Sequence, residues 1–289
     1  MKLVLGSAQF GMDYGYSNNR RISQIEFRKI EKLVLKSKIK FIDTAKSYGC
    51  SERVIGNSKL KKLNIITKIK LPNKNNISIK NWVSSEVLDS INLLKVKKLY
   101  GVLIHDYKDL LGRSGREYIY LLQALKKRKI INKIGISIYD PKEIKKILKF
   151  WKPDIVQFPF NIFDNRILNS KLIIILKKLK IEIYARSAFL QGALIDDYSS
   201  FKFKKKYKHL FNKFNHWCSV NNISKIQACL HFIKQYKKID YLVVGFNNYN
   251  HLKEIINVFK QKQIIIPNKF STNDINLIDP RRWNHKKKF

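Results

Sequence analysis

The sequence predicts a (β/α)8 barrel formed by a single domain. Short apolar runs alternate with longer amphipathic stretches along the chain, which is the pattern of a parallel sheet with crossover helices. Eight such units can be recognised, and eight parallel strands are the number that closes a barrel. An open doubly wound sheet is the alternative, but no Gly-x-Gly-x-x-Gly sequence follows the first expected strand.

The expected strands are apolar runs, several of which end on a polar residue. We place them at Leu3–Ser7, Ile39–Thr44, Asn64–Lys68, Leu99–His105, Lys133–Ile138, Asp154–Phe158, Ile181–Ala185 and Tyr241–Val244. The barrel then covers about residues 3–260 of the 289. The remaining tail, 264–289, has no clear period, and it either covers the barrel mouth or ends partly disordered.

The expected helices begin at residues whose side chains can cap free backbone N–H groups. Ser23 with Glu26 and Ser224 with Gln227 have the spacing of capping boxes, and Asp140 precedes a proline at the first helical position. We expect helices after Ser23, from an N-cap at Ser51 to Leu60, at Ser78–Leu94, Glu117–Lys129, after Asp140, and at Ile167–Leu179, Phe203–Val220, Ser224–Tyr236 and Asn250–Lys260.

The charge of the chain is strongly positive, at +38, with 59 basic and 21 acidic residues. A polyanion-binding protein is therefore one interpretation. However, 48 of the basic residues are Lys and only 11 are Arg, the residue that dominates bidentate phosphate and base contacts. The lysines are also spread over nearly every expected helix, so we expect no specific nucleic-acid partner.

The three cysteines, Cys50, Cys218 and Cys229, are far apart and share no metal-ligand spacing with histidine. We expect free thiols and no metal site. The first residues match a strand better than a signal peptide, and no apolar run approaches the ~20 residues of a membrane-spanning helix. These observations predict a cytoplasmic protein without a membrane partner.

Four candidate catalytic residues lie at or just after the ends of consecutive expected strands, where barrel enzymes place their chemistry. They are Asp43, Tyr48, Lys68 and His105. These types suit carbonyl reduction, because a phenol can protonate the alkoxide that a hydride leaves and an ammonium can lower the phenol's pKa. The carboxylate would anchor the ammonium, and the imidazole would orient the carbonyl. Taken singly, each has a structural alternative: an interior ion pair, a strand-end histidine or a loop tyrosine.

Around these residues the sequence resembles the aldo-keto reductases. The segment Asp43-Thr44-Ala45-x-x-Tyr48-Gly49-x-Ser51-Glu52 is similar to that family's signature, and Lys68 and His105 complete its tetrad. The opening Gly6-Ser7-Ala8-Gln9-Phe10-Gly11-Met12-Asp13-Tyr14-Gly15 is similar to a bacterial subgroup often linked to surface-sugar biosynthesis. The resemblance implies a nicotinamide cofactor lying across the barrel mouth.

By position, the resemblance implies cofactor contacts at the barrel mouth. Ser137 and Gln157 would hold the carboxamide, although Ile138 stands where the family has Asn. Arg186 stands where the family commonly stacks an aromatic ring on the nicotinamide, and Ser187 to Gly192 would cradle the pyrophosphate. The full set of expected contacts is Gly6, Ser7, Ser137, Gln157, Arg186, Ser187, Leu190, Gly192, Gly245, Asn248, His251 and Glu254.

The adenine end of the implied cofactor site departs from the family pattern. Members that bind the 2′-phosphate of NADP usually have Arg where Asn247, Asn248 and His251 stand, while Glu254 fits the adenine-contacting carboxylate. NADP is the family default and NAD stays open. Cys50 lies near the site, but no base is free to activate it, so we do not expect it to be catalytic.

The sequence thus predicts an NAD(P)H-dependent enzyme that reduces an aldehyde or ketone to an alcohol. A basic mouth would favour an anionic substrate, such as a phosphorylated or nucleotide-linked sugar carbonyl. The alternative is a cofactor-binding regulatory or scaffold protein with little turnover, suggested by the departures at Ile138, Arg186 and His251.

Overall fold

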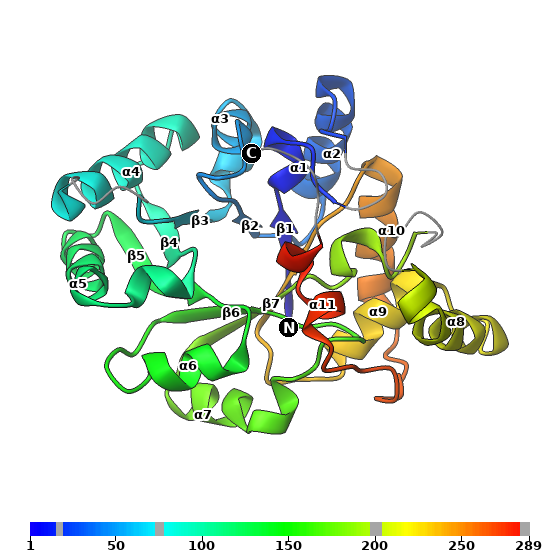
Figure 1. Ribbon diagram of the computed structural model, residues 1–289. Helices are drawn as coiled ribbons and strands as arrows, with labels where there is room; N and C mark the ends of the chain where they lie inside the picture. Colours follow the sequence, from blue (N-terminus) through cyan, green and yellow to red (C-terminus); the bar gives the residue numbers. More distant parts are fainter. Residues whose placement is uncertain (16–19, 73–77, 197–203, 284–289) are drawn as a thin grey trace.

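Eight parallel strands close into a barrel in sequence order, so that β1 pairs with both β2 and β8 (Figure 1). The computed structural model describes residues 1–15, 20–72, 78–196 and 204–283. The strands are β1 (Lys2–Gly6), β2 (Phe41–Asp43), β3 (Asn64–Ile69), β4 (Leu99–Ile104), β5 (Ile131–Ser137), β6 (Ile155–Pro159), β7 (Glu182–Arg186) and β8 (Tyr241–Val244). This confirms the predicted (β/α)8 barrel.

Helices surround the barrel and return the chain to the start of the next strand (Figure 1). They are α1 (Ala8–Gly11), α2 (Gln24–Lys36), α3 (Ser51–Gly56), α4 (Ile79–Leu94), α5 (Arg113–Lys127), α6 (Pro141–Ile147), α7 (Leu172–Lys178), α8 (Lys204–Val220), α9 (Lys225–Lys234), α10 (Tyr249–Lys260) and α11 (Ile275–Ile278). Short 3₁₀ turns occur at η1 (Lys59–Lys62), η2 (Tyr107–Leu110), η3 (Leu168–Ser170), η4 (Leu190–Gly192) and η6 (Pro280–Arg282).

Several helix starts confirm the capping predictions, and others correct them. Asp140 forms the full capping box with Glu143, and Ser23 accepts from the Glu26 N–H. Instead of completing that capping box, the Glu26 carboxylate accepts from the Tyr249 N–H at 2.5 Å, and this bond links α2 to α10. Ser224 likewise caps α9, whereas the Gln227 amide donates to Gln261.

Two expected helices differ in extent from the prediction. Ser51 is the first residue of α3 and not its N-cap, because its hydroxyl is already bonded to Ser7 of the neighbouring segment. The expected helix 167–179 is broken at Lys171, whose φ of 55° interrupts the helical backbone between η3 and α7. A local 3.6-residue period does not reveal such a break.

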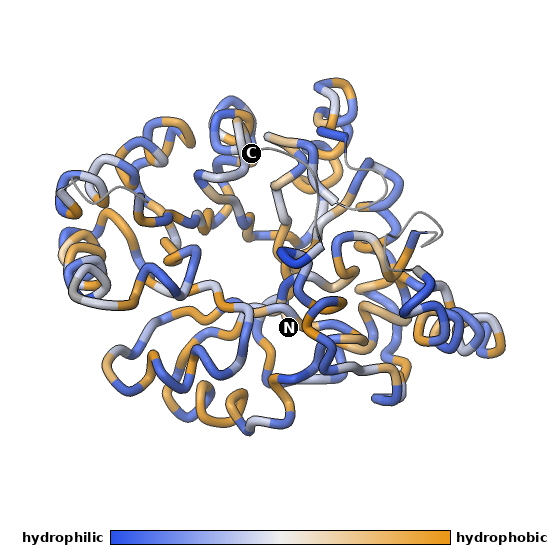
Figure 2. Tube along the Cα trace, in the orientation of Figure 1, coloured by the Kyte–Doolittle hydropathy of each residue, from blue (hydrophilic) through white to orange (hydrophobic). Residues whose placement is uncertain are grey.

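Buried apolar residues form two clusters, one on each side of the sheet. Figure 2, which colours the Cα trace by hydropathy, shows apolar and polar residues alternating along the strands and helices. The larger cluster fills the space between strands and helices. The smaller fills the barrel interior with Val4, Phe41, Ile66, Leu103, Ile155, Tyr184, Tyr241 and Val243. This interior cluster lies below the mouth, and the cavity at the mouth is lined by the polar residues at the carboxyl ends of the strands.

The tail packs against the barrel as far as the structure describes it. Phe270, Leu277 and Trp283 are buried, and the Thr272 N–H donates to Phe163 O at 2.9 Å. The described part of the tail is therefore packed against the barrel, and its place over the mouth stays a prediction; residues 284–289 lie outside the described part. Within the described residues, no helix combines the length and the apolarity needed to cross a membrane.

Candidate active site

Alternation along the strands explains why polar side chains meet at the mouth. Side chains on a strand point alternately to its two faces, so the residue two positions after an interior residue is also interior. Phe41, Ile66, Leu103, Ile155 and Tyr184 belong to the interior cluster. Two positions further along the same segments stand Asp43, Lys68, His105, Gln157 and Arg186. One layer of interior side chains is thus apolar, and the next layer toward the mouth consists of polar and charged side chains.

This polar layer lines a cavity at the mouth that holds about 990 Å³ of space, counting the part open to solvent. The size suits a cofactor or a drug-sized ligand. All four predicted catalytic residues, Asp43, Tyr48, Lys68 and His105, line it. So do most of the predicted cofactor contacts: Gly6, Ser7, Ser137, Gln157, Arg186, Ser187, Gly192, Gly245 and His251.

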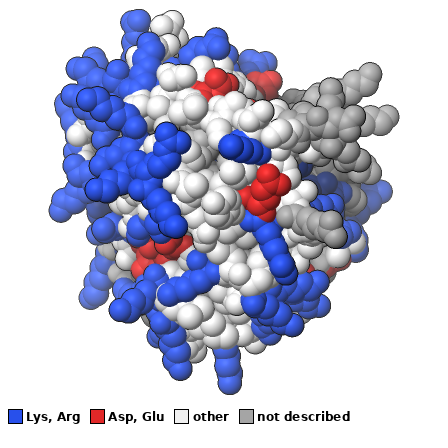
Figure 3. Space-filling model, turned by 90° about the vertical axis from the view of Figure 1, so that its left-hand side faces the viewer, with Lys and Arg blue, Asp and Glu red and all other residues white. Residues whose placement is uncertain are grey.

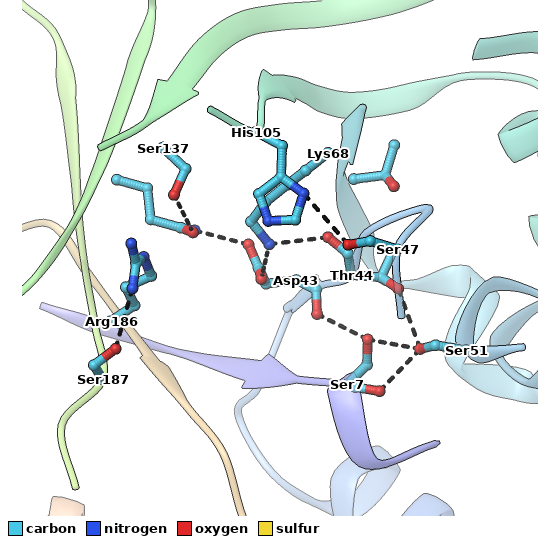
Figure 4. Close-up of polar contacts among 12 residues, drawn as sticks. Ser7, Asp43, Thr44, Ser47, Ser51, Lys68, His105, Ser137, Arg186 and Ser187 are labelled. Carbon is cyan, nitrogen blue, oxygen red and sulfur yellow. Dashed lines mark hydrogen bonds and ion pairs between the residues drawn. The ribbon is translucent and has the colours of Figure 1, made fainter. Parts of the chain in front are cut away.

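A buried ion pair between Lys68 and Asp43 forms the floor of the site (Figure 4). The two side chains are only 1% and 4% exposed. Lys68 Nζ also donates to Thr44 O at 3.0 Å, and Gln157 Nε2 donates to Asp43 Oδ2 at 2.8 Å. Ser137 Oγ donates to Gln157 Oε1 at 3.5 Å, so the two residues expected to hold a carboxamide are linked to the ion pair.

Tyr48 lies above this ion pair. Lys68 Nζ is 5.0 Å from its ring centroid, and the His105 ring centroid is 6.2 Å away. Among the described residues the Tyr48 hydroxyl has no hydrogen-bond partner. Burial, followed by the Asp43 charge, raises the pKa of Tyr48, whereas Arg186 opposes the rise. This differs from the expected lowering by Lys68, because Asp43 pairs with that ammonium.

The protonation states of Lys68 and His105 follow from burial. Burial lowers the pKa of Lys68, and the Asp43 carboxylate opposes that change. Burial and the positive charges of Lys68 and Arg186 lower the pKa of His105 to about 3, so its imidazole is neutral at pH 7. The Ser47 hydroxyl lies 3.4 Å from His105 Nδ1 (Figure 4).

A network of hydroxyl groups fixes the loop that carries Tyr48. Ser51 Oγ lies 2.9 Å from both Ser7 O and Ser7 Oγ, and Thr44 Oγ1 donates to Ser51 Oγ at 3.1 Å (Figure 4). Gly11 approaches the same loop so closely that a Cβ there would stand 1.9 Å from Tyr48 O. The loop is therefore held between β1, β2 and α1.

The segment after β7 offers unpaired backbone donors to the cavity. Ser187, Gln191 and Gly192 have φ values of 61°, 54° and 99°, which turn the chain tightly. Among the described residues, the N–H groups of Ala188, Phe189 and Gln191 have no hydrogen-bond partner. Successive free N–H groups in such turns bind anions, so the segment fits the pyrophosphate of a dinucleotide.

Three predicted cofactor contacts do not line the cavity. Leu190 is fully buried in the core, and its N–H donates to Ser187 O. Asn248 is the N-cap of α10, with its side chain accepting from the His251 N–H at 2.8 Å. Glu254 is exposed on α10. Each was placed by position alone, which does not tell whether a side chain already has a structural role.

His251 presents an unpartnered polar atom to the same cavity. Its Nδ1 accepts from the Asn247 N–H at 3.3 Å, so the neutral ring carries its proton on Nε2. Among the described residues, Nε2 is buried without a partner. Burial lowers the pKa of this histidine. The adenosine end of a dinucleotide, with its ribose hydroxyls, fits this free donor, and no Lys or Arg among the described lining residues stands beside it.

Several lining residues were not predicted from the sequence. They include Tyr14 and Gly15 in the opening segment, Tyr139 after β5, and Ile195 after β7. Tyr139 could have been found, because it follows Ser137 by two positions. The others lie in loops, where no period applies. Among the described residues, no group of three or more His, Cys, Asp or Glu side chains could hold a metal ion, and all three cysteines are free.

An eight-stranded barrel whose mouth joins a tyrosine, a buried lysine–aspartate pair and a neutral histidine defines a class of oxidoreductase barrels. The model of the aldo/keto reductase family matches residues 2–268, and the chain belongs to that family. Subgroup membership stays a prediction. No curated protein matches the chain significantly.

Solved structures of bacterial aldo-keto reductases have the same fold. An aldo-keto reductase of Bacillus halodurans in its holo form superposes with a TM-score of 0.71 at 16% identity, over 91% of this chain and 88% of its own. The glycerol dehydrogenase of Gluconobacter oxydans gives 0.68 at 18% identity, over 99% and 93%. Identities this low support the shared fold and leave the substrate open.

Proposed function

We propose that the protein reduces an aldehyde or ketone to an alcohol with a nicotinamide dinucleotide. The observation that carries the proposal is the unpartnered Tyr48 hydroxyl in the cavity, above the buried Lys68–Asp43 pair and beside His105. Family membership supports an oxidoreductase. The four catalytic roles rest on the geometry of this chain.

The cavity fits the dinucleotide along its length. When bound, the cofactor supplies a hydride to the carbonyl carbon. Ser137 and Gln157 would hold its carboxamide, and the free N–H groups after β7 its pyrophosphate. NADP(H) is the family default, but no cation stands beside His251 among the described lining residues, which supports NAD(H) as well.

Proton transfer in this proposal comes from Tyr48. Its raised pKa keeps the phenol protonated at pH 7, so the proton is present when the alkoxide forms. The Lys68 ammonium lies below the ring, where its pairing with Asp43 limits its effect on the phenolate left behind, and the Arg186 charge is the one that favours the phenolate. When Ser47 donates to His105 Nδ1, Nε2 carries the proton and donates to the carbonyl oxygen, which orients the substrate.

The proposed substrate is a small carbonyl compound, and a phosphorylated or nucleotide-linked sugar is the favoured class. Exposed lysines lie at both ends of the barrel: Lys95, Lys97, Lys98, Lys127 and Lys129 precede β4 and β5, whereas Lys70 and Lys108 follow β3 and β4 at the mouth. Figure 3, which views the α4–α5 side, shows basic side chains gathered most densely at the left of the view, with others at its bottom and lower right. Support for an anionic substrate comes from Arg186 in the cavity instead.

A cofactor-binding regulatory protein with little turnover is the second candidate. The observation that favours it is Ile138, whose side chain is buried in the core where the family has an amide for the cofactor. Against it stands the complete set of catalytic side chains, because binding alone has no need for the buried Lys68–Asp43 pair beneath Tyr48.

The test is a fluorescence titration with NADPH and NADH, followed by turnover of a carbonyl panel by wild type and Tyr48→Phe. We expect both proteins to bind cofactor and only wild type to turn over, with Tyr48→Phe at least about a hundredfold slower. Cofactor binding without turnover by wild type on the whole panel would favour the regulatory candidate. Equal turnover of neutral aldehydes and anionic sugars would contradict the proposed substrate class.

A further inference from the structure

Arg186 is a cation in the cavity without an acidic partner. Its guanidinium donates to Ile138 O at 3.1 Å and to Ser187 Oγ at 3.2 Å, both neutral acceptors (Figure 4 draws the second). No carboxylate within the described residues forms an ion pair with it. Arg186 therefore has no ion pair of its own among the described residues, although its charge also acts on the Asp164 carboxylate, which is already paired with Arg166.

The other charged groups of the cavity cancel or are neutral. The Lys68 ammonium is paired with Asp43, and the His105 and His251 rings are neutral at pH 7. Tyr48 keeps its proton. Among the described residues that line the cavity, the remaining net charge is thus the single positive charge of Arg186.

The guanidinium is held in place by a stack that reaches into the tail. Arg186 lies 4.1 Å from the centroid of the Tyr139 ring, and Arg281 lies 3.6 Å from the same centroid. Arg281 is fixed in turn by Asp279, through Nε–Oδ1 and Nη2–Oδ2 contacts of 2.9 and 2.7 Å. Arg281 is thus a positioning residue that fixes Tyr139, against which Arg186 packs.

We propose that Arg186 makes the cavity bind the reduced nicotinamide cofactor more tightly than the oxidised one, so that the protein is loaded with the reduced form and releases the oxidised form readily. The inference rests on the proposed function. The reduced ring is neutral and the oxidised ring carries a positive charge, whereas both forms have the same phosphates. The ratio of their dissociation constants therefore isolates the effect of Arg186 on the ring from its effect on the phosphates.

The expected effect is at least tenfold in that ratio. Two like charges within a few ångströms of each other repel by more than a factor of ten in affinity at the effective dielectric of a partly exposed site. By linkage, a tenfold preference for the reduced form raises the two-electron potential of the bound couple by about 30 mV, so the preference acts through cofactor loading and release and not by making the bound hydride easier to lose.

Two substitutions separate charge from packing. Arg186→Gln removes the charge and keeps a donor for Ile138 O, and Arg186→Lys keeps the charge and loses the planar stack. We expect Arg186→Gln to lower the ratio of the oxidised to the reduced dissociation constant at least tenfold, mainly through tighter binding of the oxidised form. Arg186→Lys should keep the ratio within about threefold of wild type.

The measurement is calorimetric titration of both redox forms at low ionic strength, with no substrate present. Arg282→Ala is the matched control, because it removes an exposed positive charge beside Arg281 that makes no stack. Arg281→Ala should shift the ratio in the same direction as Arg186→Gln but less, and Arg282→Ala should leave it unchanged.

Equal affinity of wild type for the two redox forms would overturn the inference, whatever the variants do. So would an Arg186→Gln ratio within twofold of wild type in a variant that still binds the reduced form. Failure of wild type to bind either form would instead overturn the proposed function itself. The three outcomes are distinct in the same titration.

Discussion

Replacing Asp43 with Asn tests whether the buried Lys68 ammonium is tolerated in the barrel interior only because Asp43 neutralises its charge. The substitution keeps the shape of the side chain and removes its charge. Lys68 is 1% exposed and would keep only neutral acceptors, Thr44 O at 3.0 Å and the new amide oxygen. Gln157 would also lose its charged acceptor at 2.8 Å. Breaking a buried pair on one side costs about 3–5 kcal/mol, a large share of the ~5–15 kcal/mol that stabilises a domain.

The pH dependence of this loss has a definite sign. Burial already lowers the pKa of Lys68, and Asp43 is the group that opposes this. In Asp43→Asn the folded protein therefore releases the proton more easily than the unfolded chain does. Since the unfolded state then binds more protons, the free energy of unfolding rises with pH until it passes the ordinary pKa of lysine. The variant should regain part of its stability between pH 7 and pH 9.

Urea unfolding at pH 7 and pH 9 measures both effects, with Lys68→Met/Asp43→Asn as the companion variant. The double variant should be more stable than Asp43→Asn at pH 7, because no buried charge is left without a partner. The proposed role of Asp43 would be wrong if the free energy of unfolding of Asp43→Asn at pH 7 lay within about 1 kcal/mol of that of wild type. It would also be wrong if the double variant were no more stable than Asp43→Asn, because the interior would then tolerate the Lys68 charge without Asp43.

Three further predictions concern single side chains around the cavity. Between pH 6 and pH 4 the free energy of unfolding of wild type should fall by about 1.4 kcal/mol per pH unit through His105, because the folded imidazole, with a pKa of about 3, binds fewer protons than the unfolded one. His105→Gln should lack this contribution in urea unfolding. Parallel slopes of the free energy of unfolding against pH for the two proteins would contradict this. Gly11→Ala should destabilise the protein by at least about 1–3 kcal/mol in thermal unfolding, because its Cβ would stand 1.9 Å from Tyr48 O, and an unchanged melting temperature would refute the close approach. His251→Arg should improve NADPH over NADH binding about tenfold in titrations, because a guanidinium would reach a 2′-phosphate where a neutral ring now stands; no shift would mean that the adenosine end lies elsewhere.

The parts of this fold that could be predicted are those with a local signal. Apolar runs marked all eight strands, and the polar residues that ended several of them, Asp43, Lys68 and His105, line the cavity together. The reason is the two-residue alternation of a strand, which acts over a few positions and needs no tertiary information. The same signal marks Gln157 and Arg186 as members of the same layer.

The parts that could not be predicted depend on contacts between distant segments. Ser51 has the chemistry of an N-cap, but a serine far away in the sequence takes its hydroxyl. Asn248 was assigned to the cofactor, yet it caps a helix. The stack of Arg281 on Tyr139 joins the tail to the loop after β5, and no periodicity in either segment indicates it. Where a side chain has two possible partners, tertiary packing decides which of them it contacts.

The closed lower end of the barrel explains why the chemistry is confined to the mouth. Tyr184 and Tyr241 stack at 4.2 Å with rings 10° apart, and Phe41 packs edge-on against Tyr241 at 4.9 Å, so aromatic rings fill the interior below the ion pair. Lys68 is buried above these rings, and burial is the largest influence on its pKa. The pair of Lys68 and Asp43 therefore forms a buried polar floor under Tyr48, with Lys68 Nζ 5.0 Å from the ring centroid. The apolar layer of the barrel is part of the site, because it holds that pair beneath the ring that must give up a proton.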